Sequence, residues 1–202
     1  MSETKTKYKL GLQLPTDPRW ANMAEISLEE ILTDHAFCEQ KATTSCISLI
    51  QKYPKHTRLV NKLSPVVTEE WGHFRLVIAE MEKRGMQLGE QRNDEYVVAL
   101  RKFQKKDGSR ETALIDALLA FALIEARSCE RFRLLSLNIS DPKLRDFYHM
   151  FMVSEAGHYR MFLDLAYHYA DDDVFVKNRW QQYLDFEEEL MKTLKPRADR
   201  MH

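Results

Sequence analysis

The sequence predicts an all-α fold: a four-helix bundle with a long crossover connection and a peripheral C-terminal helix. Only six glycines and six prolines occur among 202 residues, and apolar residues recur every three or four positions along four long segments. Two Glu-x-x-His motifs fit this pattern, because side chains three residues apart share one face of a helix. We expect residues 1–202 to form a single domain.

The first long helix is expected after an irregular N-terminal segment, residues 1–26, which two prolines interrupt. Ser27 followed by Glu30 has the pattern of a capping box and predicts a helix that runs to about Tyr53. Glu39 lies on the apolar face of this helix, where a carboxylate needs an explanation.

The second helix has two possible starts and one clear end. Ser64 and Pro65 fit an N-cap followed by a proline in the first helical position, but a proline-kinked helix that begins earlier fits equally well. Gly85 is expected to end the helix after about Arg84.

The second half of the chain is expected to repeat this arrangement over residues 111–170. Residues 86–110 form the long crossover, with a short helix near 94–105, and the third long helix spans about 111–137. Asp141 and Pro142 are expected to start the fourth. The Asp171–Asp173 run can cap a fifth, peripheral helix that ends near Leu194.

Six candidate metal ligands repeat at nearly equal spacing. Each Glu-x-x-His motif follows a glutamate that lies about thirty residues earlier on an apolar helix face, a ligand set typical of ferritin-like bundles that hold two metal ions. The six residues are Glu39, Glu70, His73, Glu125, Glu155 and His158.

The chemistry of these ligands favours two divalent ions. Burying one unpaired carboxylate costs several kcal/mol, whereas two divalent ions balance four carboxylates. Mixed carboxylate and imidazole ligands suit iron or manganese, while structural zinc favours thiolates. We expect each motif to hold one ion with the preceding glutamate, and the motif glutamates are the usual bridging candidates.

Several neighbours of these ligands have more than one interpretation. Glu69 is either a hydrogen-bond acceptor for a metal-bound histidine or a solvated helix residue. His35 could serve a similar role, although an ordinary core histidine is the simpler interpretation, and Glu130 is expected to be exposed. Three cysteines are expected to be reduced core residues, because no CxxC pair occurs: Cys38, Cys46 and Cys129.

Composition limits the classes of partner. A formal net charge of −1, from 30 basic and 31 acidic side chains, excludes nucleic-acid binding driven by overall charge, so RNA would need a local basic patch. No apolar run long enough for a membrane span and no signal-peptide pattern is present, which predicts a cytoplasmic protein. Three groups of basic residues are candidates for phosphate contacts: Lys52, Lys55, Arg58 and Lys62; Lys83, Arg84 and Arg92; Arg101, Lys102, Lys105, Lys106 and Arg110.

The segments around the ligands resemble a known family. The chain is similar to the bacterial tRNA-(2-methylthio-N6-isopentenyladenosine) hydroxylases, ferritin-like non-haem di-iron monooxygenases that modify an adenosine beside the anticodon. The resemblance covers essentially the whole chain, lacks no ligand, and rests on four segments: Asp34–Ala42, Thr68–Phe74, Leu123–Phe132 and Ser154–Tyr159.

This resemblance implies hydroxylation of the isopentenyl group by two iron ions, with manganese as the less favoured metal. It further implies a tRNA substrate, O2 as the oxidant and a separate electron-donor protein, since the chain has no reductase domain or flavin motif. Three alternatives remain at this point. The bundle could oxidise iron or scavenge peroxide like ferritins and rubrerythrins, act as a manganese catalase, or be a non-catalytic RNA-binding module with a structural metal site.

Overall fold

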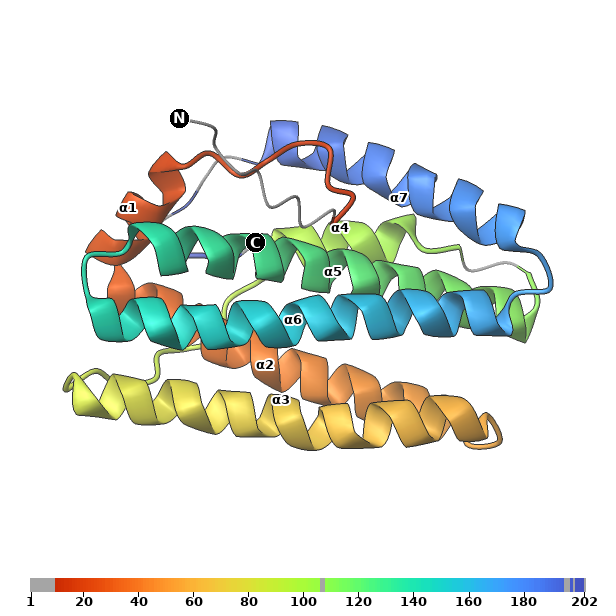
Figure 1. The fold of residues 1–202 in the computed structure, drawn as a ribbon, viewed down its shortest axis with the longest axis horizontal. Coiled ribbons are helices and arrows are strands. Elements are labelled where there is room, and N and C mark those ends of the chain that lie inside the picture. Colours follow the sequence, from red (N-terminus) through yellow and green to blue (C-terminus); the bar gives the residue numbers. More distant parts are fainter. Residues whose placement is uncertain (1–9, 106–107, 195–196, 198, 202) are drawn as a thin grey trace, which may run out of the picture.

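The computed structural model describes residues 10–105, 108–194, 197 and 199–201, and over these residues the protein is all-helical (Figure 1). The helices are α1 (Arg19–Ile26), α2 (Leu28–Lys52), α3 (Thr57–Lys83), α4 (Glu95–Phe103), α5 (Arg110–Asn138), α6 (Pro142–Tyr169) and α7 (Asp173–Thr193).

Four long helices form two antiparallel hairpins, α2 with α3 and α5 with α6 (Figure 1). Short loops close the hairpins, whereas residues 84–109 connect them and carry α4. A connection that travels along the bundle is typical of ferritin-like folds. The predicted four-helix bundle, its crossover and its peripheral C-terminal helix α7 are therefore confirmed.

The prediction for the start of the chain is partly wrong. Residues 19–26 form α1, while residues 1–9 lie outside the described residues. Pro18 has helical dihedral angles (φ −56°, ψ −25°) at the N-cap, so it starts a helix instead of interrupting one. Ser27 lies directly between α1 and α2, and its side chain makes no capping hydrogen bond, so the predicted capping box is also wrong.

The alternative of an earlier start is correct for the second long helix. α3 begins at Thr57 and continues through Pro65, which lacks only one backbone donor. Its end is as predicted, because Gly85 has the positive φ of 69° that favours glycine. Asp94, Asp141 and Asp172 each cap the helix that follows them by accepting a backbone N–H hydrogen bond.

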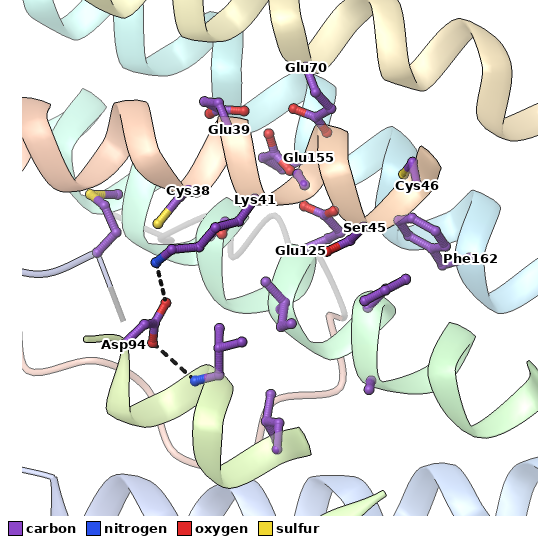
Figure 2. Close-up of a pocket in the computed structure, with 18 of the residues that line it drawn as sticks. Cys38, Glu39, Lys41, Ser45, Cys46, Glu70, Asp94, Glu125, Glu155 and Phe162 are labelled. Carbon is purple, nitrogen blue, oxygen red and sulfur yellow. Dashed lines mark hydrogen bonds and ion pairs between the residues drawn. The ribbon is translucent and has the colours of Figure 1, made fainter. Parts of the chain in front are cut away.

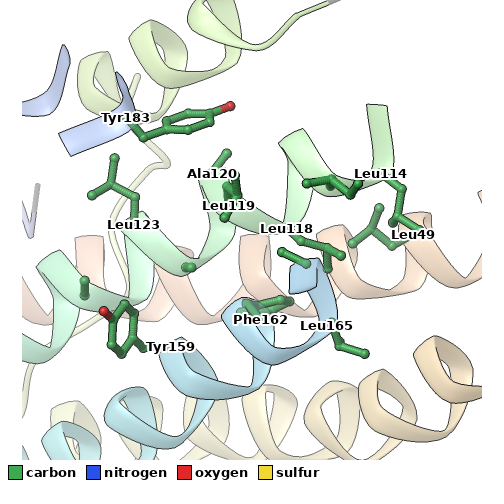
Figure 3. Close-up of a cluster of buried hydrophobic side chains, with 14 of the residues drawn as sticks. Leu49, Leu114, Leu118, Leu119, Ala120, Leu123, Tyr159, Phe162, Leu165 and Tyr183 are labelled. Carbon is green, nitrogen blue, oxygen red and sulfur yellow. The ribbon is translucent and has the colours of Figure 1, made fainter. Parts of the chain in front are cut away.

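Two apolar clusters fill the bundle, and the predicted ligands lie where the clusters meet. On α3, Leu63 and Val66 belong to the first cluster and Val77 to the second, with the Glu-x-x-His motif between them. The first cluster continues into α5, α6 and α7 (Figure 3). Burial between two apolar regions lowers the local dielectric and strengthens every electrostatic interaction among the ligands.

A buried ion-pair network attaches the N-terminal segment and α7 to α5. The Arg127 side chain is fully buried, and it donates to Glu187 at 2.8 and 2.5 Å and to the Leu14 carbonyl at 3.0 Å. Glu130 accepts the Thr16 backbone N–H and hydroxyl at 2.9 and 2.7 Å. The prediction that Glu130 is exposed is wrong, because its side chain is only 17% exposed.

Among the described residues, none of the helices combines the length and the apolar composition that crossing a membrane requires.

Candidate metal centre

All six predicted ligands lie buried at the middle of the bundle. Each side chain comes from the inward face of one of the four long helices, and each Glu-x-x-His motif places its two members one helical turn apart. Glu39 comes from α2, Glu70 and His73 from α3, Glu125 from α5, and Glu155 and His158 from α6.

These side chains form two overlapping groups of four. Glu39 and His73 join Glu70 and Glu155 in one group, and the other group consists of Glu125, His158 and the same two motif glutamates. Within each group, one ligand atom per residue lies within 4.8 Å of the others. Glu70 and Glu155 belong to both groups, so the two groups share these carboxylates.

Both histidines point the same ring nitrogen toward the carboxylates. Nδ1 of His73 lies 3.2 Å from Glu70 Oε2 and 3.5 Å from Glu39 Oε2. Nδ1 of His158 lies 2.8 Å from Glu70 Oε1 and 3.7 Å from Glu155 Oε2. In each ring, Nε2 is left to face away from the cluster.

The buried carboxylates outnumber the histidines that could balance their charge, and their shifted pKa values reflect this excess. Burial and the charge of Glu70 raise the pKa of Glu39 well above its usual range, and burial and Glu155 do the same for Glu125. Burial would also raise the pKa of Glu70, but close contacts with the two histidines outweigh it and lower that pKa. Burial would lower the pKa of His158, yet its contacts with Glu155 and Glu70 raise it to about 12.

Two divalent ions fit this donor set. Glu70 Oε1 and His158 Nδ1 are buried and have no hydrogen bond of acceptable geometry, although they face each other at 2.8 Å. A cation bound by both atoms would remove this defect and compensate the carboxylates. Oxygen and imidazole nitrogen donors without a thiolate match iron or manganese.

The neighbouring residues also have defined places. His35 is fully buried among aromatic rings, and its Nε2 lies 2.7 Å from Glu39 Oε1. Glu69 is half-exposed, with its carboxylate 3.3 Å from Nε2 of His158 and 3.9 Å from Nε2 of His73. Cys46 and Cys129 are buried, as predicted, whereas Cys38 is only partly buried; none of these three described cysteines forms a disulfide.

A pocket of about 840 Å³, including its open mouth, leads to the ligands between α2, α4 and α5 (Figure 2). All four glutamates line it, with mostly apolar walls around them. The sequence did not reveal one feature of its wall, the ion pair of Lys41 and Asp94 at 3.4 Å, because the partners lie 53 residues apart. Arg101 and Gln104 line the pocket from the α4 side.

Comparison with known proteins identifies the family. The family model described as tRNA-(MS[2]IO[6]A)-hydroxylase (MiaE) matches residues 3–202. The chain belongs to this family. One MiaE relative, from Pseudomonas putida, is 38% identical over 161 residues, which cover 80% of this chain and 77% of the relative. Another, from Salmonella typhimurium, is 26% identical over 218 aligned positions and covers 84% of this chain and 80% of the relative. Both are named tRNA 2-(methylsulfanyl)-N(6)-isopentenyladenosine(37) hydroxylase.

This MiaE-family chain is also similar to the solved structure of an oxygenase. It is described as Protein 43 with aldehyde deformylating oxygenase activity from Synechococcus, and its sequence is 30% identical. The two folds superpose with a TM-score of 0.88 over 95% of this chain and 94% of that chain. The predicted ferritin-like fold and the family resemblance are thus confirmed.

Proposed function

We propose that this MiaE-family protein hydroxylates the isopentenyl group of 2-methylthio-N6-isopentenyladenosine, beside the anticodon of tRNA, with a di-iron centre. The names of its relatives supply the substrate and the reaction. The observation that carries the proposal is that all four candidate carboxylate ligands line one open pocket. A substrate group in that pocket would meet the metal centre directly.

We expect the six residues to bind two ions between them. Glu70 and Glu155 belong to both ligand groups, so we expect each to contact both ions. Glu39 and His73, from the α2–α3 hairpin, would complete one side, and Glu125 and His158, from the α5–α6 hairpin, would complete the other. When bound, the two ions would supply the activation of O2; the overall reaction takes two electrons and two protons, places one oxygen atom in a substrate C–H bond and releases the other as water.

The pocket walls suit a branched, five-carbon hydrocarbon group. Burial of that group against them is favourable and keeps water away from the reacting carbon. Polar side chains of Lys41, Asp94 and Gln104 also line the pocket, and a purine and its ribose would need such partners. The apolar wall residues include Ala42, Cys46, Leu100, Ala120, Phe121, Ile124 and Phe162.

The reaction needs partners that the chain does not supply. O2 is the oxidant, and the electrons come from a separate donor protein, because the sequence has no flavin or reductase motif. A tRNA substrate is consistent with a cytoplasmic protein. Ferritin-like iron storage and peroxide scavenging do not require a pocket that reaches the ligands, so the pocket favours the hydroxylase over these alternatives.

The decisive experiment is turnover with isotopically labelled oxygen. Iron-loaded protein would be mixed with an electron donor, ¹⁸O2 and tRNA that carries the modified adenosine, and the nucleosides would be analysed by mass spectrometry. We expect one ¹⁸O atom in the isopentenyl group, and none with Glu70→Ala or Glu155→Ala. Full iron loading without labelled product would overturn the proposal. Glu82→Ala, an exposed change on the same helix as Glu70, is the matched control.

A further inference from the structure

The three groups of basic residues that the sequence suggested as phosphate contacts differ in their ion pairing. The group on α3 and the crossover is neutralised by acidic partners, so it has little charge to offer to RNA. Lys83 pairs with Glu80 at 3.3 Å, Arg84 pairs with Glu80 at 2.9 Å and with Asp141 at 2.5 Å, and Arg92 pairs with Glu30 and, at 3.3 Å, with Asp199.

The other two groups keep their charge. All their described members are exposed, and none forms an ion pair with an acidic side chain in the described part of the chain; Lys106 lies outside it. Without these eight side chains the formal net charge would fall from −1 to −9. We call them the basic end surface: Lys52, Lys55, Arg58, Lys62, Arg101, Lys102, Lys105 and Arg110.

The two groups meet at Tyr53. The Lys52 ammonium lies 5.4 Å and the Arg110 guanidinium 5.1 Å from the centre of this buried ring. The Tyr53 hydroxyl donates to the Arg110 carbonyl at 3.1 Å, and Arg110 donates to the Lys52 carbonyl. The end of α2 and the start of α5 are thereby joined at one end of the bundle (Figure 1).

The basic end surface also reaches the pocket. Arg101 is exposed and lines the pocket, so it lies at the rim. The Lys105 backbone N–H donates to Asp116 Oδ2 at 2.8 Å, which fixes the end of α4 against α5. Asp116 is six residues from Arg110, or about 9 Å along the helix at 1.5 Å per residue. The exposed cations therefore extend from the pocket rim to the end of the bundle.

We propose that the basic end surface binds the phosphates of the tRNA anticodon arm and holds the modified adenosine at the pocket. This inference rests on the proposed function, because it places the RNA where its base would enter the same pocket. Unpaired lysines and arginines bind phosphates with release of counterions, and they fix position without reading sequence. Specificity for the modified base is left to the pocket.

The test is binding of an anticodon stem-loop to the full-length, iron-loaded protein at several salt concentrations. Two double variants remove charge from each half of the surface: Lys52→Gln with Lys55→Gln, and Arg101→Gln with Lys105→Gln. Log affinity falls linearly with log salt, and each lost phosphate contact makes this slope less steep by about one. We therefore expect each double variant to have a slope that is less steep by about two. Lys143→Gln with Lys192→Gln removes two exposed cations elsewhere and should leave the slope unchanged.

The outcomes separate this surface from the proposed reaction. Wild-type affinity and slope in both double variants, or equal losses in the control pair, would overturn the proposal even if hydroxylation is confirmed. Weaker binding and a smaller slope in both double variants alone would support it even if no hydroxylated product forms. If turnover occurs, we expect a higher KM for tRNA in these variants with unchanged iron content, because the ligands lie outside the surface.

Discussion

Glu69 and Ser154 occupy equivalent positions, one residue before each Glu-x-x-His motif, and they hydrogen-bond to each other across the bundle at 2.6 Å. The Ser154 hydroxyl donates to Glu69 Oε1, while the other Glu69 oxygen faces Nε2 of His158. The Glu69 carboxylate therefore lies near the histidines of both motifs. A second carboxylate in place of Ser154 would bring two like charges together, which the serine avoids.

Removing the Glu69 carboxylate should weaken iron binding without removing a ligand. Acceptors that orient metal-bound histidines commonly contribute 10–100-fold in affinity, so we expect a loss of about that size in Glu69→Ala. Glu69→Gln keeps an acceptor and should lose less. Chelator-competition titrations measure the affinity, with exposed Glu82→Ala as the control. Wild-type affinity in Glu69→Ala would show that Glu69 is only a solvated helix residue.

The metal-free protein should lose stability as the pH rises. The pKa values of Glu39 and Glu125 are raised by burial and neighbouring carboxylates, and contacts with carboxylates raise that of His158 to about 12. A group with a higher pKa in the folded state binds more protons when folded, so stability falls with rising pH. Above about pH 6.5, the ordinary pKa of histidine, all three groups therefore lower the stability of the folded state as the pH rises.

Thermal unfolding at several pH values checks this sign. We expect the Tm of the metal-free protein to fall between about pH 6.5 and 8.5, above the unfolded pKa of each group. Iron should raise the Tm and flatten this dependence, because it replaces the protons that the carboxylates otherwise hold. A metal-free Tm that rises over the same interval would contradict the assigned directions.

Filling the pocket should slow turnover without weakening metal binding. Ala42 lines the pocket from α2, and Ala42→Phe would occupy space assigned to the isopentenyl group. We expect kcat/KM to fall at least about tenfold, or ~1.4 kcal/mol of transition-state stabilisation, with unchanged iron content. Thr44→Phe adds the same ring to the exposed face of α2 and is the control. Normal turnover by Ala42→Phe would show that the substrate does not bind in this pocket.

The Arg127–Glu187 ion pair should matter for stability. Glu187→Ala would leave the fully buried Arg127 charge without its main partner, and breaking a buried pair costs about 3–5 kcal/mol. For a chain of this size, that corresponds to a fall in Tm of about 6–20 °C. Glu189→Ala, on the exposed side of α7, should change the Tm little. Equal Tm values for the two variants would refute the assigned role of Glu187.

The sequence predicted those features that depend on spacing along one helix. The Glu-x-x-His motifs, the nearly equal sequence spacings to the preceding glutamates and the aspartate caps could be predicted without knowing how the helices pack. Features that depend on the rotation of one helix against another were not predictable. Examples are the contact of Glu69 with His158, 89 residues away, and the Lys41–Asp94 pair in the pocket wall.

Local patterns misled where tertiary contacts outweighed them. Two prolines suggested an irregular start, but burial of Trp20 stabilises α1, with the Arg131 guanidinium 4.3 Å from its ring. Glu130 lies on the outer side of α5 by helical periodicity, yet the N-terminal segment covers it and supplies Thr16 as a donor. Thr16 lies before α1 and outside the helices, so helical periodicity could not predict its contact with Glu130.

The most direct test of the central claim is anomalous diffraction at the iron absorption edge from crystals of the iron-loaded protein. The proposed centre predicts two peaks about 3.5–4 Å apart, both within ligand distance of Glu70 and Glu155. One peak should also contact Glu39 and His73, and the other Glu125 and His158. A single peak, or iron bound away from these six residues, would contradict the di-iron centre from which the proposed reaction is derived.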